Sequence, residues 1–87
     1  MRERKDLFEE DLTAQLGNGP TSIFTTTYAF WGGSTAIWIN GVNQGLPNTP
    51  TSSFRETGPQ SIEVLVFPLR PPDKLFIQYR PRWTVPV

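Results

Sequence analysis

From Thr21 to the end of the chain, short runs of β-branched and aromatic residues alternate with clusters of Gly, Pro, Asn and Ser. The chain holds nine prolines and seven glycines, and proline removes the backbone donor that helix interiors and central strands need, so the elements between these residues must be short. No helical period survives in this region. The pattern is typical of a small all-β domain, here over residues 21–87.

The alternation of apolar and polar residues predicts where the strands lie. In the last clear run, KLFIQYR, Leu75, Ile77 and Tyr79 are expected to face the core. The run SIEVLVF is apolar on both faces, which is typical of a central strand with cover on both sides. Strands are expected at residues 22–28, 35–40, 52–56, 61–67 and 74–80.

The first part of the chain has a different pattern. Phe8, Leu12 and Leu16 recur at the spacing of one helix face, although an isolated helix of this length is marginal in water. The sequence GNGP at 17–20 breaks any helix. The predicted organisation is therefore an N-terminal arm over residues 1–20, helical at 5–16 where a partner packs on it, followed by an all-β domain over residues 21–87.

The dipeptide Asn40-Gly41 follows the expected strand TAIWIN. Both residues tolerate a positive φ, so they predict the tight turn of a β-hairpin. The alternative interpretation is a lectin-like patch on the loop 41–48, in which Asn43 and Gln44 hydrogen-bond sugar hydroxyls and Trp38 stacks on a sugar ring. That alternative requires Trp38 to be exposed.

The residues needed for most catalytic chemistry are missing. The chain has no cysteine and no histidine, which excludes disulfides, thiolate metal sites, thiol catalysis and the commonest general base. The part after the arm holds only Glu56, Glu63 and Asp73 as carboxylates, and no phosphate-binding loop or calcium loop is present. We therefore expect a protein that is not an enzyme and that uses no cofactor and no metal.

The charges balance, with eight basic and eight acidic residues. A dominant phosphate-binding role needs a surplus of Lys and Arg, so we expect no specific nucleic acid, and we interpret the bases near the last strand as a solvated rim. No apolar run approaches the roughly 20 residues of a membrane span, and the N-terminus lacks the apolar region of a secretory signal. The expected site of synthesis is a reducing cytoplasm, and no membrane partner is expected.

The order and spacing of the turns and strands over residues 17–81 resemble a small β-sandwich module of tailed-bacteriophage virion structural proteins. The likeness rests on Asn40-Gly41 at a strand end, a Pro-rich turn before the last strand, and Tyr79 near its end. The matching stretches are GNGPTSIFTTTYAF (17–30), STAIWINGVNQGL (34–46), SIEVLVFPLRPPDK (61–74) and LFIQYRP (75–81). The resemblance implies that residues 21–87 form an antiparallel β-sandwich domain, immunoglobulin-like or jelly-roll-like. It also implies a part of a virion, in the neck or collar, a fibre, the baseplate or the head decoration.

Aromatic residues suggest how such a protein would act. Three tryptophans, two tyrosines and six phenylalanines exceed what one thin sandwich can bury, so they either cap its open ends or form interfaces, where aromatics are enriched. We expect an accessory virion protein that binds the major capsid protein or the portal and connector, and also its own copies. The alternative is a carbohydrate-binding host-recognition module of a tail or head fibre. The residues expected to bind partners are Leu7, Phe8, Leu12, Leu16, Trp31, Phe76 and Trp83.

Overall fold

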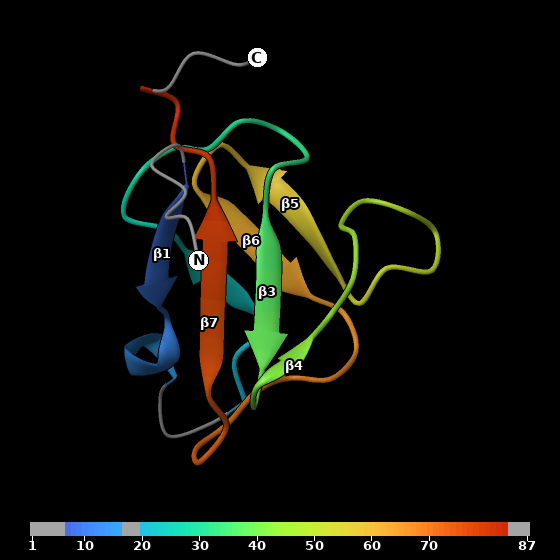
Figure 1. Ribbon diagram of the computed structural model, residues 1–87. Coiled ribbons are helices and arrows are strands. Elements are labelled where there is room, and N and C mark those ends of the chain that lie inside the picture. Colours follow the sequence, from blue (N-terminus) through green and yellow to red (C-terminus); the bar gives the residue numbers. More distant parts are fainter. Residues whose placement is uncertain (1–6, 17–19, 84–87) are drawn as a thin grey trace.

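The computed structural model describes residues 7–16 and 20–83 and shows two antiparallel sheets packed face to face (Figure 1). One sheet has the strand order β1-β7-β3-β4, and the other has the order β2-β6-β5. The predicted all-β sandwich is confirmed. The elements are β1 (Phe8–Asp11), a 3-10 helix (Thr13–Gln15), β2 (Ile23–Thr25), β3 (Ala36–Ile39), β4 (Val42–Asn43), β5 (Phe54–Gly58), β6 (Ser61–Val64) and β7 (Leu75–Tyr79).

The core lies between the two sheets and follows the alternation of the strands. In β7, Leu75, Ile77 and Tyr79 are fully buried, as predicted, because successive side chains point to opposite faces of a sheet. Large buried side chains of this kind each stabilise a fold by roughly 1.5–3 kcal/mol. The other buried apolar residues are Leu12, Phe24, Phe30, Ile37, Ile39, Phe54, Ile62, Val64 and Leu69.

The strand predicted at residues 61–67 is shorter in the structure, where β6 ends at Val64. The amide of Leu65 still donates to the carbonyl of Ser53 at 2.7 Å, but the chain then bends, and Pro68 has no amide to continue the pairing. Leu65, Val66 and Phe67 are 46%, 49% and 45% exposed. The prediction that the whole run 61–67 is a strand covered on both faces is therefore wrong after Val64.

The prediction of a helix at residues 5–16 is wrong for the described part of that segment. Residues 8–11 form β1, which pairs antiparallel with β7, and Leu12 lies in the core with its amide donating to the carbonyl of Leu75 at 2.9 Å. Pairing with β1 satisfies the backbone of β7 along a whole edge, which a helix cannot do. Residues 7–16 thus belong to the sandwich rather than to an arm before it, while residues 1–6 and 17–19 lie outside the described residues.

The predicted hairpin turn at Asn40 and Gly41 is confirmed between β3 and β4. Both residues have positive φ, 52° and 85°, as in the type I′ turns that suit two-residue hairpins. The Asn40 side chain joins this turn to the one before β7, because its Nδ2 donates to Asp73 Oδ1 at 3.1 Å and its Oδ1 accepts from the amide of Lys74 at 2.9 Å. The hydrogen bond from Asn40 lowers the pKa of Asp73.

Replacing Gly41 by alanine is expected to destabilise the hairpin. An L-residue at φ +85° pays a steric cost of roughly 1–2 kcal/mol, so the free energy of unfolding should fall by about that amount in urea titrations. The matched control is Gly32→Ala, because Gly32 is free of the positive-φ constraint and an added Cβ there meets nothing within 4 Å. Equal losses in the two variants would contradict this account of the turn.

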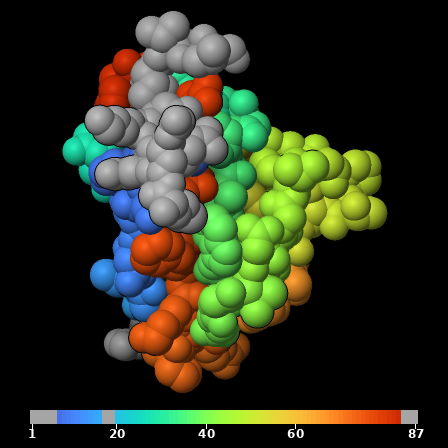
Figure 2. Space-filling model, viewed as in Figure 1, coloured from blue at the N-terminus to red at the C-terminus, as the bar shows by residue number. Residues whose placement is uncertain are grey.

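The loop between β4 and β5 projects from the body of the molecule (yellow-green in Figure 2). It is held by its own polar groups. The Ser52 hydroxyl donates to the carbonyl of Leu46 at 2.6 Å and accepts from the amide of Thr49 at 2.9 Å. Asn43 Oδ1 accepts from the amide of Gly45 at 3.0 Å. The many Asn, Ser and Thr residues of this loop thus serve its own conformation.

Candidate functional site

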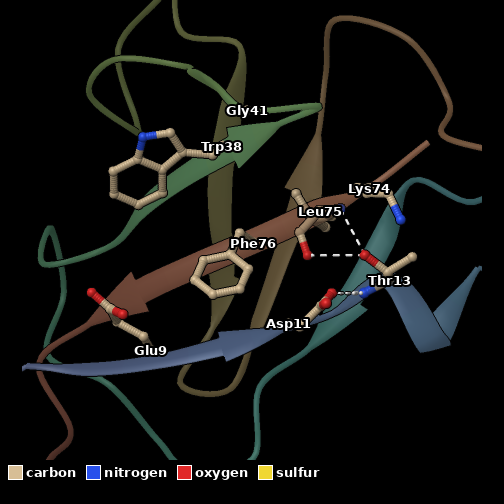
Figure 3. A pocket seen from close by; sticks show the side chains of 8 residues that line it. All are labelled: Glu9, Asp11, Thr13, Trp38, Gly41, Lys74, Leu75 and Phe76. Carbon is tan, nitrogen blue, oxygen red and sulfur yellow. Dashed lines mark hydrogen bonds between the residues drawn. The ribbon is translucent and has the colours of Figure 1, made fainter.

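A groove lies on the outer face of the four-stranded sheet, on the side away from the core (Figure 3). Its volume of about 540 Å³ lies within the range of small-molecule sites. The lining side chains come from β1, the 3-10 helix, β3, the hairpin turn and the start of β7. They are Glu9, Asp11, Thr13, Trp38, Gly41, Lys74, Leu75 and Phe76.

The strand register builds the aromatic floor of the groove. Trp38 of β3 is directly opposite Phe76 of β7, and Asp11 of β1 is opposite Phe76 on its other side. Directly opposite side chains share one face of a sheet and lie in contact range. Phe76 is 42% exposed and Trp38 is half-buried. In Figure 3 the Phe76 ring stands between Trp38 on one side and the carboxylates of β1 on the other.

The rim of the groove is polar and carries both signs of charge. Asp11 Oδ1 accepts from the amide of Thr13 at 2.8 Å, and hydrogen bonding to Thr13 lowers the pKa of the Asp11 carboxyl. Glu9 Oε2 accepts from Gln78 Nε2 at 2.8 Å. Within residues 7–16 and 20–83, the second oxygen of each carboxylate and the ammonium of Lys74 make no hydrogen bond. The groove therefore offers donors and acceptors around an aromatic floor.

A second group of aromatic rings covers one end of the sandwich. Trp83 is 62% exposed, yet its ring packs edge-on against Tyr28 with centroids 4.5 Å apart, and Tyr28 in turn contacts Phe8 at 5.2 Å. Trp31 lies elsewhere, under the guanidinium of Arg82, whose Cζ is 5.2 Å from the ring centroid. The interpretation of these aromatics as end caps accounts for Phe8 and Trp83.

The residues expected to bind partners are spread over several parts of the fold. The prediction that Leu12 binds a partner is wrong, because only 1% of Leu12 is exposed. Leu7 and Trp31 are half-buried and line one shallow pocket together, while Phe76 lies in the groove. Phe8 and Leu16 pack against the core, and Trp83 remains exposed.

Sequence reasoning missed part of the groove. Trp38 was expected to act only in the sugar-binding alternative, which requires it to be exposed; it lies outside the core on the outer face of the sheet, but it is half-buried there. Glu9 and Asp11 were not expected to contribute to a site, because the segment that carries them was read as a helix. The alternation in β3 could have placed Trp38 on the outer face in advance, because Ile37 and Ile39 on either side of it are buried and Trp38 must point the other way.

The buried hydroxyl of Tyr79 joins β1 to the segment after β2. It donates to Glu10 Oε2 at 2.5 Å and accepts from the amide of Tyr28 at 3.3 Å. The same Glu10 carboxylate accepts from the amide and the hydroxyl of Thr27 at 3.0 and 2.8 Å. Burial, and then the hydrogen bond to Glu10, raise the pKa of Tyr79 well above its ordinary value.

This raised pKa predicts alkaline instability. The folded state holds the Tyr79 proton more tightly than the unfolded state, so the stabilisation is complete below the ordinary tyrosine pKa of 10.0 and is lost as the pH rises above it. Tyr79→Phe should lose less stability than the wild type between about pH 9 and about pH 11, as measured by urea titrations at each pH. A wild-type slope in Tyr79→Phe would refute the linkage.

The described part of the chain lacks the features of two other kinds of site. Among residues 7–16 and 20–83, no three His, Cys, Asp or Glu side chains gather where they could hold a metal ion. The same residues contain no helix with the length and apolar character needed to cross a membrane. Among the described residues, the groove is the candidate site for a ligand that we consider.

The fold and the groove define a small all-β sandwich whose larger sheet carries an aromatic-floored groove on its outer face. No protein-family model matches the chain, and comparisons with curated proteins and with solved structures find no significant match. Inferences about function therefore rest on the chemistry of the surface.

Proposed function

We propose that this protein is a non-enzymatic structural component of a bacteriophage virion. In this proposal it is an accessory protein that binds other virion proteins, either at the neck, collar or connector or on the capsid as a decoration protein. The order of strands and turns that resembles phage virion modules supports the placement in a virion. The binding role is supported by a separate feature of the surface.

The observation that carries the binding role is a run of three consecutive exposed apolar residues, Leu65, Val66 and Phe67, which we call the apolar patch. These residues follow β6 and are 46%, 49% and 45% exposed, and Ile23 of the neighbouring strand β2 is 60% exposed. Consecutive exposed apolar residues are unfavourable in water unless a partner covers them. Burying this patch against a capsid or connector protein, or a second copy, would remove that apolar surface from water.

Antibody labelling tests where the protein resides. Gold-conjugated antibody to this chain is applied to purified particles of the source virus. Gold spread over the head would support decoration, and gold at one vertex would support the neck, collar or connector. Absence of gold from intact particles and from particles opened at the neck would overturn the placement in a virion.

A patch variant tests the binding role. Leu65→Ser combined with Phe67→Ser should fold normally, because both side chains are exposed, and should be depleted from purified particles. The matched control is Val42→Ser, which changes an apolar residue that is 62% exposed on β4, in the other sheet. Normal incorporation of the patch variant, measured by quantitative immunoblotting of particles, would refute the role of the patch.

A further inference from the structure

We infer that the groove on the outer face of the four-stranded sheet is a carbohydrate-binding site for a neutral or amino sugar. One pyranose ring would lie against Trp38 and Phe76, with Glu9, Asp11 and Lys74 around its rim. This inference is independent of the proposed assembly role, because the groove and the apolar patch belong to different sheets.

The floor of the groove has the chemistry that a sugar ring needs. The faces of aromatic rings carry partial negative charge, and the axial C–H groups on one face of a pyranose carry partial positive charge. Trp38 and Phe76 are directly opposed on neighbouring strands, so the sheet holds both rings in place before a ligand arrives. Sites built on strands are more rigid than sites on loops, which lowers the entropy lost on binding.

The rim of the groove complements hydroxyl groups. Each sugar hydroxyl can both donate and accept, and the rim offers acceptors on Glu9 and Asp11 and a donor on Lys74. One oxygen of each carboxylate is already used, by Gln78 Nε2 and by the amide of Thr13. These two hydrogen bonds orient the carboxylates and leave the second oxygen of each for a ligand. The polar groups that contact the sugar thus come from β1 and β7 rather than from the loop 41–48.

Charge narrows the class of sugar. Two carboxylates and one ammonium leave the rim with a net negative charge, which disfavours sialic and uronic acids because like charges repel. Neutral sugars meet no such penalty, and an amino sugar gains from the carboxylates. The geometry therefore favours neutral and amino sugars over acidic ones.

The same features argue against a peptide ligand. The floor is the face of a sheet whose central strand β7 is paired on both sides, so a peptide cannot join it by adding a strand. A lysine or arginine side chain could still stack on the rings beside the carboxylates, so a cationic peptide is the competing ligand that the test must distinguish.

A glycan array tests the inference with the full chain. The biotinylated protein is bound to streptavidin, so that several copies raise the avidity of weak single sites, and is applied to an array of neutral, amino and acidic oligosaccharides. Binding to neutral or amino glycans and not to sialylated ones is the expected result. Trp38→Ala should weaken that binding by about tenfold or more, and Phe76→Ala is a second variant in case the first does not fold. Trp83→Ala removes an exposed tryptophan outside the groove and should bind like the wild type.

Absence of binding to every neutral and amino glycan on the array would overturn the inference, as would undiminished binding by folded Trp38→Ala and Phe76→Ala. Preference for sialylated glycans would overturn the argument from charge. Binding of a tetra-arginine peptide that is lost in Trp38→Ala, with no glycan bound, would assign the groove to a cationic peptide instead.

Discussion

Removal of residues 1–16 is expected to leave the remainder of the chain unfolded. The deletion strips β1 from β7 and takes Leu12 out of the core. It also leaves the buried hydroxyl of Tyr79 without Glu10. Losing one buried leucine costs about 2–5 kcal/mol, and a small domain has only about 5–15 kcal/mol of stability in total, so the combined loss should exceed what the fold can bear. Near-ultraviolet circular dichroism and the dispersion of amide proton signals would measure the outcome.

The control for that deletion is a chain that lacks only residues 1–6. This shorter deletion keeps every described contact of β1 and should unfold cooperatively in urea. A cooperative transition in the chain that lacks residues 1–16 would show that β1 is dispensable. That outcome would restore the interpretation of this segment as an arm that serves only to bind a partner.

Replacing Glu56 by alanine is expected to cost about 3 kcal/mol of unfolding free energy, because hydrogen bonds to a charged acceptor contribute about 1.5–3 kcal/mol each and the buried residue Thr35 would lose its acceptor. The Glu56 carboxylate accepts from the amide of Gly33 at 2.8 Å, from the hydroxyl of Thr35 at 2.6 Å and from Nδ2 of Asn48 at 2.9 Å. One side chain of β5 thereby holds the turn before β3 and the projecting loop. Urea titration at neutral pH measures the loss.

The matched control is Glu63→Ala, on the neighbouring strand. Glu63 pairs with Arg55 at 2.7 Å, and these side chains are 26% and 57% exposed. Surface ion pairs contribute about 0–1 kcal/mol, so this variant should remain close to the wild type. Similar losses of stability in the two variants would show that the three hydrogen bonds to Glu56 do not stabilise the fold more than a surface ion pair does.

Patterns local in the sequence predicted the parts of the fold that depend on local rules. Alternation in the last strand identified Leu75, Ile77 and Tyr79 as core residues because a sheet with one buried face imposes a period of two. The pair Asn40-Gly41 identified a hairpin because few residues accept two positive φ angles in succession. These features need no knowledge of the rest of the chain.

What the sequence did not reveal depends on pairing between distant residues. The segment FEED at 8–11 carries three acidic residues and does not resemble a strand; it becomes one because β7 offers an unpaired edge. The groove has the same origin, since Glu9 and Asp11 reach its rim only through the register of β1 on β7. The outward direction of Trp38 could be read from alternation in β3, but its position opposite Phe76 could not.

The position of β7 has a consequence for the order in which the molecule can form. β7 lies between β1 and β3 in the larger sheet, and the hydrogen bond between Gln78 and Glu9 joins residues 69 positions apart. During synthesis, β1 therefore leaves the ribosome long before the strand that it pairs with. Contacts between such distant residues also slow folding, because a long loop must close first. The larger sheet and the groove on its face thus come into being only after Leu75–Tyr79 has emerged, so a growing chain presents neither the groove nor the completed sheet.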